Sequence, residues 1–155
     1  MTTDSRRFRY VLQPLQQRAL WQQQQVEHRL ARCQHWVRRL RTELEHAENA
    51  QGELIARAGL NGGTFDPARH RAAMECVLHG MQQISQIRQR LEQAQAVRLH
   101  LLRDYQNKAV QTQMYGAHRE QAQQAHLLTW QRLDQAQADG DWLARSSWQQ
   151  EASHG

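Results

Sequence analysis

One stripe of residues, spaced alternately three and four apart, runs almost unbroken from residue 12 to residue 58. This spacing places the stripe on one side of an α-helix and is typical of a helix that packs along another helix. Its members are Leu12, Gln16, Ala19, Gln23, Val26, Leu30, Cys33, Val37, Leu40, Leu44, Ala47, Gln51, Leu54 and Ala58. The pattern predicts a first helix over about residues 10–58. Pro14 falls in its first turns, where a missing N–H matters least.

A second stripe with the same spacing begins after Pro67. It contains Ala73, Val77, Gly80 or Met81, Ile84, Ile87, Leu91, Ala94, Val97, Leu101 and Tyr105, and it resumes loosely with Tyr115, Ala122, Thr129, Leu133 and Ala136. The pattern predicts a second helix over about residues 67–139 that stops at Gly140. We expect a flexible tail over about residues 146–155.

The segment GLNGGTFDP separates the two stripes. Gly59 is expected just past the end of the first helix, where a positive φ is needed, and Gly62 and Gly63 let the chain reverse. Asp66 suits the N-cap of the second helix and Pro67 its first position. A phosphate-binding loop is disfavoured, because no strand precedes the glycines and no Gly-Lys-Ser/Thr follows them.

The two helices are therefore expected to fold back on each other as an all-α antiparallel coiled-coil hairpin. A length of 155 residues, of which 26 are Gln, fits a single helical domain over 1–155. With the turn near residue 62, Cys33 faces about Gln93 and lies roughly 24 Å along the helices from Cys76. A disulfide needs Cα atoms within about 7 Å, so both cysteines are predicted to be free.

The net charge is +5, and 19 of the 20 basic residues are Arg. Because the arginines are interleaved with Glu, they indicate a solvated helical surface, and nucleic-acid binding is disfavoured. No apolar run approaches the roughly 20 residues of a membrane helix, and no apolar region follows Arg6 and Arg7 as in a signal peptide. We therefore expect a cytoplasmic protein.

Residue patterns that carry chemistry are missing from the sequence. No two of the nine histidines are three or four residues apart, the spacing that puts two metal ligands on one face of a helix. There is no Cys-x-x-Cys, Gly-x-Ser-x-Gly or His-Glu-x-x-His motif. We expect no enzyme activity, no catalytic residue, no metal and no cofactor.

Apolar residues that the pairing of two helices does not need occur at two places. The first helix is expected to run out opposite position 120, so residues 122–145 lack a partner helix. That overhang contains Leu127, Leu128, Trp130, Leu133, Trp142 and Leu143, and the start of the chain adds Phe8, Tyr10, Leu20 and Trp21. These residues either close the open end of the hairpin, drive dimerisation or bind a partner.

Beside the turn, Met74, Leu78 and Met81 form an extra stripe next to the predicted core, with His46 as a neighbour on the first helix. Such a stripe indicates either a wider core near the turn or a Met-rich docking surface.

Three segments resemble FliJ-type proteins, the small coiled-coil components of bacterial type III export. They are FRYVLQPLQQRALWQQQQVEHRLARCQ (8–34), DPARHRAAMECVLHGMQQI (66–84) and LDQAQADGDWLARSS (133–147). The first matches the opening of the family, the second its hairpin turn and the third its closing stretch. The closing stretch departs from the family at Trp142, where a Glu is usual. The family has flagellar members and YscO/HrpO counterparts in injectisomes, and the sequence leaves the choice between them open.

The resemblance implies a non-enzymatic central stalk. Such a protein binds the hexameric export ATPase and promotes its assembly, contacts the cytoplasmic domain of the export gate and escorts substrate chaperones, so it lies peripherally at the inner membrane. Mapped onto this chain, the ATPase contacts are Arg6, Phe8, Tyr10, Leu20, Trp21, Leu127, Trp130, Leu133 and Trp142. The export-gate contacts are His46, Met74, Leu78 and Met81. The alternative is a generic coiled-coil adaptor or chaperone that dimerises through its apolar ends.

Overall fold

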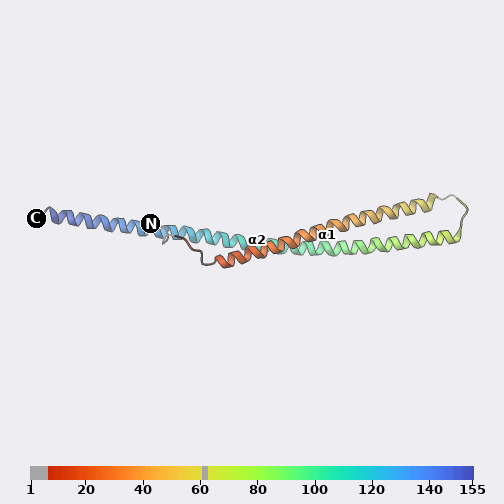
Figure 1. The fold of residues 1–155 in the computed structure, drawn as a ribbon, viewed down its shortest axis with the longest axis horizontal. Coiled ribbons are helices and arrows are strands. Elements are labelled where there is room, and N and C mark those ends of the chain that lie inside the picture. The colour runs from red at the N-terminus through yellow and green to blue at the C-terminus, as the bar shows by residue number, and fades with distance from the viewer. Residues whose placement is uncertain (1–6, 61–62) are drawn as a thin grey trace. The chain divides into compact units, whose positions relative to one another are not determined.

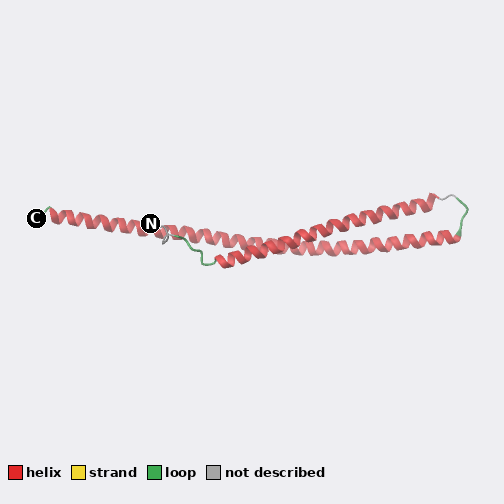
Figure 2. Cartoon of the chain, in the orientation of Figure 1, coloured by secondary structure: helices red, strands yellow, loops and turns green. Residues whose placement is uncertain are grey.

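The computed structural model describes residues 7–60 and 63–155, which form two helices and no strand. Helix α1 spans Gln13–Leu60 and helix α2 spans Pro67–Ala152 (Figure 1). Figure 2 shows that non-helical chain is confined to the ends and to the connection between the helices. The fold is the expected all-α antiparallel coiled-coil hairpin.

Contacts divide the chain into two compact units, and the single domain over 1–155 stays a prediction. The turn unit consists of Gln22–Asn107. The terminal unit consists of the described residues up to Trp21 together with Lys108–Gly155. Each unit is described by itself below.

The core of the turn unit is the seam between α1 and α2. Its buried residues are Leu30, Cys33, Val37 and Leu40 from α1 and Ile84, Ile87 and Ala94 from α2. All seven belong to the two stripes predicted from the sequence. The Cys33 thiol donates a weak hydrogen bond to the carbonyl oxygen of Ala94 at 3.5 Å. The register is thus one residue from the expected partner, Gln93, and both cysteines are free as predicted.

The α2 stripe was predicted wrongly at Val97. Val97 is 47% exposed, and Arg98 is the half-buried residue at that level of the seam. After Ala94 the seam steps by four residues rather than three. Both steps occur in a helical stripe, and the apolar Val97 made the shorter one look correct.

Gly80, rather than Met81, takes the seam position that the sequence left open between them. Gly80 is half-buried, whereas Met81 is 57% exposed. The Gln51 amide fills the space that a Cβ at position 80 would need, and its Nε2 donates to the carbonyl oxygen of Val77 at 2.9 Å. A polar side chain thus crosses from α1 to α2 at a point where the core lacks a side chain.

The connection between the helices differs from prediction at its first residue. Gly59 lies inside α1, and no glycine in the described part of the chain has a positive φ. Gly62 lies outside the described residues. The start of α2 is as predicted, because the Asp66 carboxylate accepts a hydrogen bond from the Ala68 N–H at 3.1 Å and Pro67 is the first helical residue.

Both helix ends in the terminal unit also differ from prediction. α1 begins at Gln13 rather than near residue 10. α2 does not stop at Gly140 but continues to Ala152, through most of the expected flexible tail. A glycine inside a helix costs only about 1 kcal/mol, which helical residues on both sides outweigh. Every residue from 131 to 145 is exposed.

Candidate functional site

Residues 7–12 form a non-helical segment, here called the strap, that packs on α2 within the terminal unit. Tyr10 anchors it and is only 5% exposed. Its hydroxyl lies 2.9 Å from Nδ1 of His118 and 3.4 Å from the carbonyl oxygen of Tyr115. The Tyr10 and His118 rings also contact each other, with centroids 5.7 Å apart.

Phe8 provides a second anchor for the strap. Its ring centroid lies 5.5 Å from that of His126 and 6.4 Å from that of Tyr10. The indole N–H of Trp130 donates to Nε2 of His126 at 2.9 Å. Phe8, Tyr10 and Trp130 therefore contribute to closing the terminal unit, which is one of the three roles the sequence left open.

The contacts of His118 and His126 with the strap were not predicted, because the spacing of the histidines bears only on metal binding. Their spacing of eight residues does signal a shared side of a helix, since eight residues span slightly more than two turns. Phe8 and Tyr10, two residues apart before the first helix, can each pack against one of these two imidazole rings. The pairing itself depends on the path of the strap.

Several of the residues expected to contact the ATPase are exposed. Leu127, Leu133 and Trp142 on α2 are 54%, 55% and 67% exposed. Leu20 and Trp21 on α1 are 42% and 59% exposed. Arg6 lies outside the described residues.

The exposed apolar residues at the end of α2 do not lie on one side of the helix. At about 100° per residue, Leu127 and Trp142 lie roughly 60° apart around the helix axis, and Leu133 lies opposite Trp142. Leu128, Leu143 and Trp148, at 54%, 59% and 76% exposure, fall between them. Polar residues such as Arg132, Gln135 and Asp139 lie between them, so this part of α2 carries separate apolar side chains on several sides. A single packed helix leaves much of this surface in water.

Near the turn, Met74, Leu78 and Met81 are 47%, 56% and 57% exposed. This favours a docking surface over the wider core that the sequence also allowed. His46 is also exposed, and it lines a shallow depression formed by α1 residues, among them His35 and Arg39.

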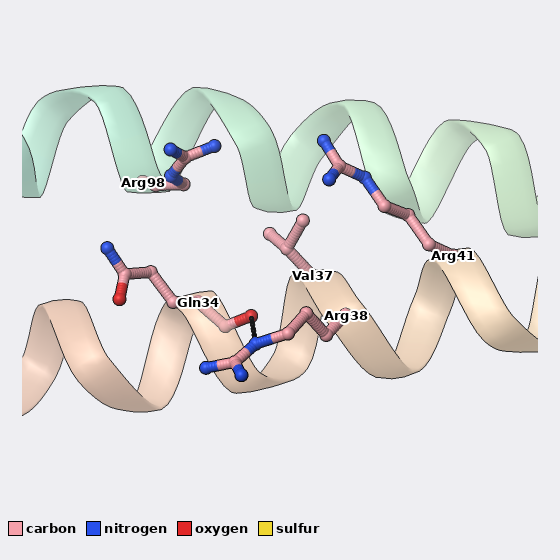
Figure 3. A pocket seen from close by; sticks show the side chains of 5 residues that line it. All are labelled: Gln34, Val37, Arg38, Arg41 and Arg98. Carbon is pink, nitrogen blue, oxygen red and sulfur yellow. Dashed lines mark hydrogen bonds between the residues drawn. The ribbon is translucent and has the colours of Figure 1, made fainter.

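A basic pocket lies between the helices of the turn unit (Figure 3). Gln34, Val37, Arg38 and Arg41 of α1 and Arg98 of α2 line it, and its volume is about 220 Å³. Arg38 Nε donates to the backbone oxygen of Gln34 at 3.4 Å. Guanidinium groups placed in this way suit carboxylate or phosphate groups.

Among the described residues, none of Arg38, Arg41 and Arg98 has a carboxylate partner. Arg88 differs, because it pairs with Glu48 across the helices at 2.7 Å. This site was not predicted, because the charge averaged over the whole chain hides a local excess of arginine. Between residues 28 and 41 there are five arginines, two histidines and no acidic residue.

Neither a metal centre nor a membrane span is found in the part of the chain that the structure describes. No group of three or more His, Cys, Asp or Glu residues in 7–60 and 63–155 is placed to hold a metal ion. Within the same ranges, no helix combines the length and the apolar character that crossing a membrane requires.

No protein-family model matches this chain, and no curated protein and no solved structure matches it.

Proposed function

We propose that this chain is a non-enzymatic central stalk of a bacterial type III protein export apparatus, and that its terminal unit enters the hexameric export ATPase. The observation that carries the proposal is the distribution of exposed apolar residues around the whole circumference of α2 from Leu127 to Trp148. A ring encloses a helix on all sides, whereas a partner on one side leaves the other sides exposed. The resemblance of three segments to FliJ-type proteins supports the same function.

In this proposal, the ATPase contacts divide into two groups. Leu20, Trp21, Leu127, Leu133 and Trp142 contact the ring directly, since each is exposed. Phe8, Tyr10 and Trp130 instead hold the strap in place. Arg6 stays a candidate contact.

Met74, Leu78 and Met81 provide the proposed contact with the cytoplasmic domain of the export gate, and His46 stays a separate candidate. Flexible thioether side chains adapt to a partner at low cost, which suits a contact that forms and breaks during export. The gate would hold the protein at the inner membrane, where it would also receive substrate chaperones.

The test is to mix the full chain with the export ATPase encoded in the same genome and to measure ring formation and ATP turnover. We expect both to rise. Replacing Leu133 and Trp142 together with Ala should weaken binding about tenfold or more, because large exposed apolar residues dominate interface energies. The matched control replaces the exposed Gln82 and Gln83 with Ala and should leave binding unchanged. Absence of binding and of any change in turnover would contradict the proposal.

The second candidate is an adaptor or chaperone that dimerises through its apolar ends. The exposure of Trp142 and Trp148 is the observation that favours it. Sedimentation discriminates between the two functions. An end-to-end dimer dissociates when Leu133 and Trp142 are replaced with Ala, whereas the stalk proposal predicts no effect of these substitutions on self-association.

A further inference from the structure

A second stripe runs along α1 within the turn unit, beside the stripe that faces α2. The stripe that faces α2 is here called the buried stripe, and its residues are buried or half-buried: Leu30, Cys33, Val37, Leu40, Leu44, Ala47, Gln51 and Leu54. Each residue of the second stripe directly precedes a position of the buried stripe, which places it about 100° to one side of the seam. Its members are Arg29, Arg32, Trp36, Arg39, Glu43, His46, Ala50 and Glu53, and all eight are exposed. We name these eight residues the flank stripe.

The flank stripe is basic in its first half and acidic in its second. Successive residues of the stripe are alternately three and four positions apart, and this series of spacings is the same from either end of the stripe. When a second copy of the stripe runs antiparallel to the first, Arg39 of one copy lies opposite Glu43 of the other. In the same way, Trp36 lies opposite His46, and Arg29 lies opposite Glu53. These are the alternating layers formed by two antiparallel helices that pack along a heptad seam, with Arg41 at the midpoint.

Within one hairpin, the charged residues of this stripe form few ion pairs among the described residues. Among the described residues, neither Arg39 nor Glu43 takes part in an ion pair. Glu53 has only a long contact, 3.8 Å, with the exposed Arg57 one turn further along α1. Such exposed pairs within one helix contribute little stability.

The charge pattern determines which partner fits. A nucleic acid or an acidic protein would complement Arg29, Arg32 and Arg39 but would be repelled by Glu43 and Glu53. A second copy of this chain, running in the opposite direction, complements both halves at once. Because the flank stripe lies to one side of the seam, α2 of each copy keeps its place, as in a four-helix bundle.

We propose that two copies of this chain form an antiparallel dimer through the flank stripes of their α1 helices. The two-fold axis passes between the two α1 helices at the level of residue 41, whose side chain points away from the other copy. Each layer therefore occurs twice, once on either side of the axis. Trp36 and His46 stack at the centre of each half, and the Arg–Glu layers select the antiparallel register.

The test is sedimentation equilibrium of the full chain and of two charge-reversal variants at several protein concentrations. R39E places a second carboxylate opposite Glu43 of the other copy, and E43R places a second guanidinium opposite Arg39. Each substitution introduces two repulsive layers per dimer, so each variant alone should dimerise at least about tenfold more weakly. An equimolar mixture of the two variants should recover the dimer, because the heterodimer again opposes unlike charges in both layers.

R38E and E45R are the matched controls, since they make the same charge changes at exposed positions directly after, rather than before, buried-stripe positions. Both should dimerise like the wild type. The double variant R39E/E43R should also dimerise, and this arm covers the case in which a single substitution perturbs folding, which circular dichroism detects.

Three results would overturn the proposal. They are a wild-type chain that stays monomeric at every concentration, a dimer that survives both R39E and E43R, and a mixture and a double variant that both stay monomeric. The second of these results would move the interface to the apolar ends of the chain.

Discussion

The turn unit and the terminal unit bury apolar surface in different ways. In the turn unit, α1 and α2 cover each other along a continuous seam, and Val37 and Leu40 are 2% and 3% exposed. In the terminal unit, the strap contacts α2 through the rings of Phe8 and Tyr10, and Ala19 of α1 is buried. From residue 131 to 145, however, every residue of α2 is exposed. The paired helices contribute seven buried residues, from Leu30 to Leu40 and from Ile84 to Ala94, whereas the strap contributes one, Tyr10. The first arrangement provides stability, and the second leaves surface for a partner.

The largest expected effect is on the seam. Leu40→Ala should lower the free energy of unfolding by about 2–4 kcal/mol, because it removes buried methyl groups and leaves a cavity. Leu133→Ala, at a position that is 55% exposed, should change it by less than about 0.5 kcal/mol. Urea unfolding followed by circular dichroism measures both. Equal changes in the free energy of unfolding for the two substitutions would show that position 133 is packed as tightly as position 40.

The next effect is on the strap. Tyr10→Ala removes the contacts with His118 and Tyr115, so the strap should open more often. Trypsin should then cleave after Arg9 about tenfold faster or more, since about 1.4 kcal/mol of lost anchoring is a tenfold change in the open population. Tyr10→Phe keeps the ring and should show a smaller increase.

Amide hydrogen exchange in the turn unit is the control for this experiment, because it should not change in either Tyr10 variant. An unchanged cleavage rate in Tyr10→Ala would mean that the strap is not held by this residue.

The smallest effect concerns the polar contact inside the seam. Gly80→Ala gains about 1 kcal/mol of helix propensity but displaces the Gln51 amide from Val77, so the two effects should nearly cancel. In a Gln51→Ala background the same substitution should stabilise the protein by about 1 kcal/mol. A double-mutant cycle of urea unfolding measures this coupling, and additive effects of the two substitutions would exclude it.

Much of the fold was predictable because a helical stripe depends on local spacing. The seam residues of α1 from Leu30 to Leu40 and the cap at Asp66 and Pro67 were confirmed. The helix ends were predicted less well. Gly59 and Gly140 are both helical, because a glycine permits a helix to end but does not require it.

The candidate site was predictable only as a set of surplus apolar residues. Phe8, Tyr10 and Trp130 appeared equivalent to Trp142, but they have partners within the terminal unit. The partners of the first two, His126 and His118, are more than a hundred residues away in the chain, and no local spacing links them. Arg98 was missed for a similar reason, since Val97 satisfies the apolar pattern equally well.

Local periodicity and turn chemistry were sufficient to determine two helices, their antiparallel pairing and a register accurate to about one helical turn, because each depends on residues close in sequence. The tertiary structure alone decided which aromatic residues are used to hold the strap and which remain exposed. It also placed Gln51 in the space beside Gly80 and showed that the flank stripe stays uncovered. These features depend on pairs of distant residues meeting at one level of two helices, and the spacing within one helix does not encode such meetings.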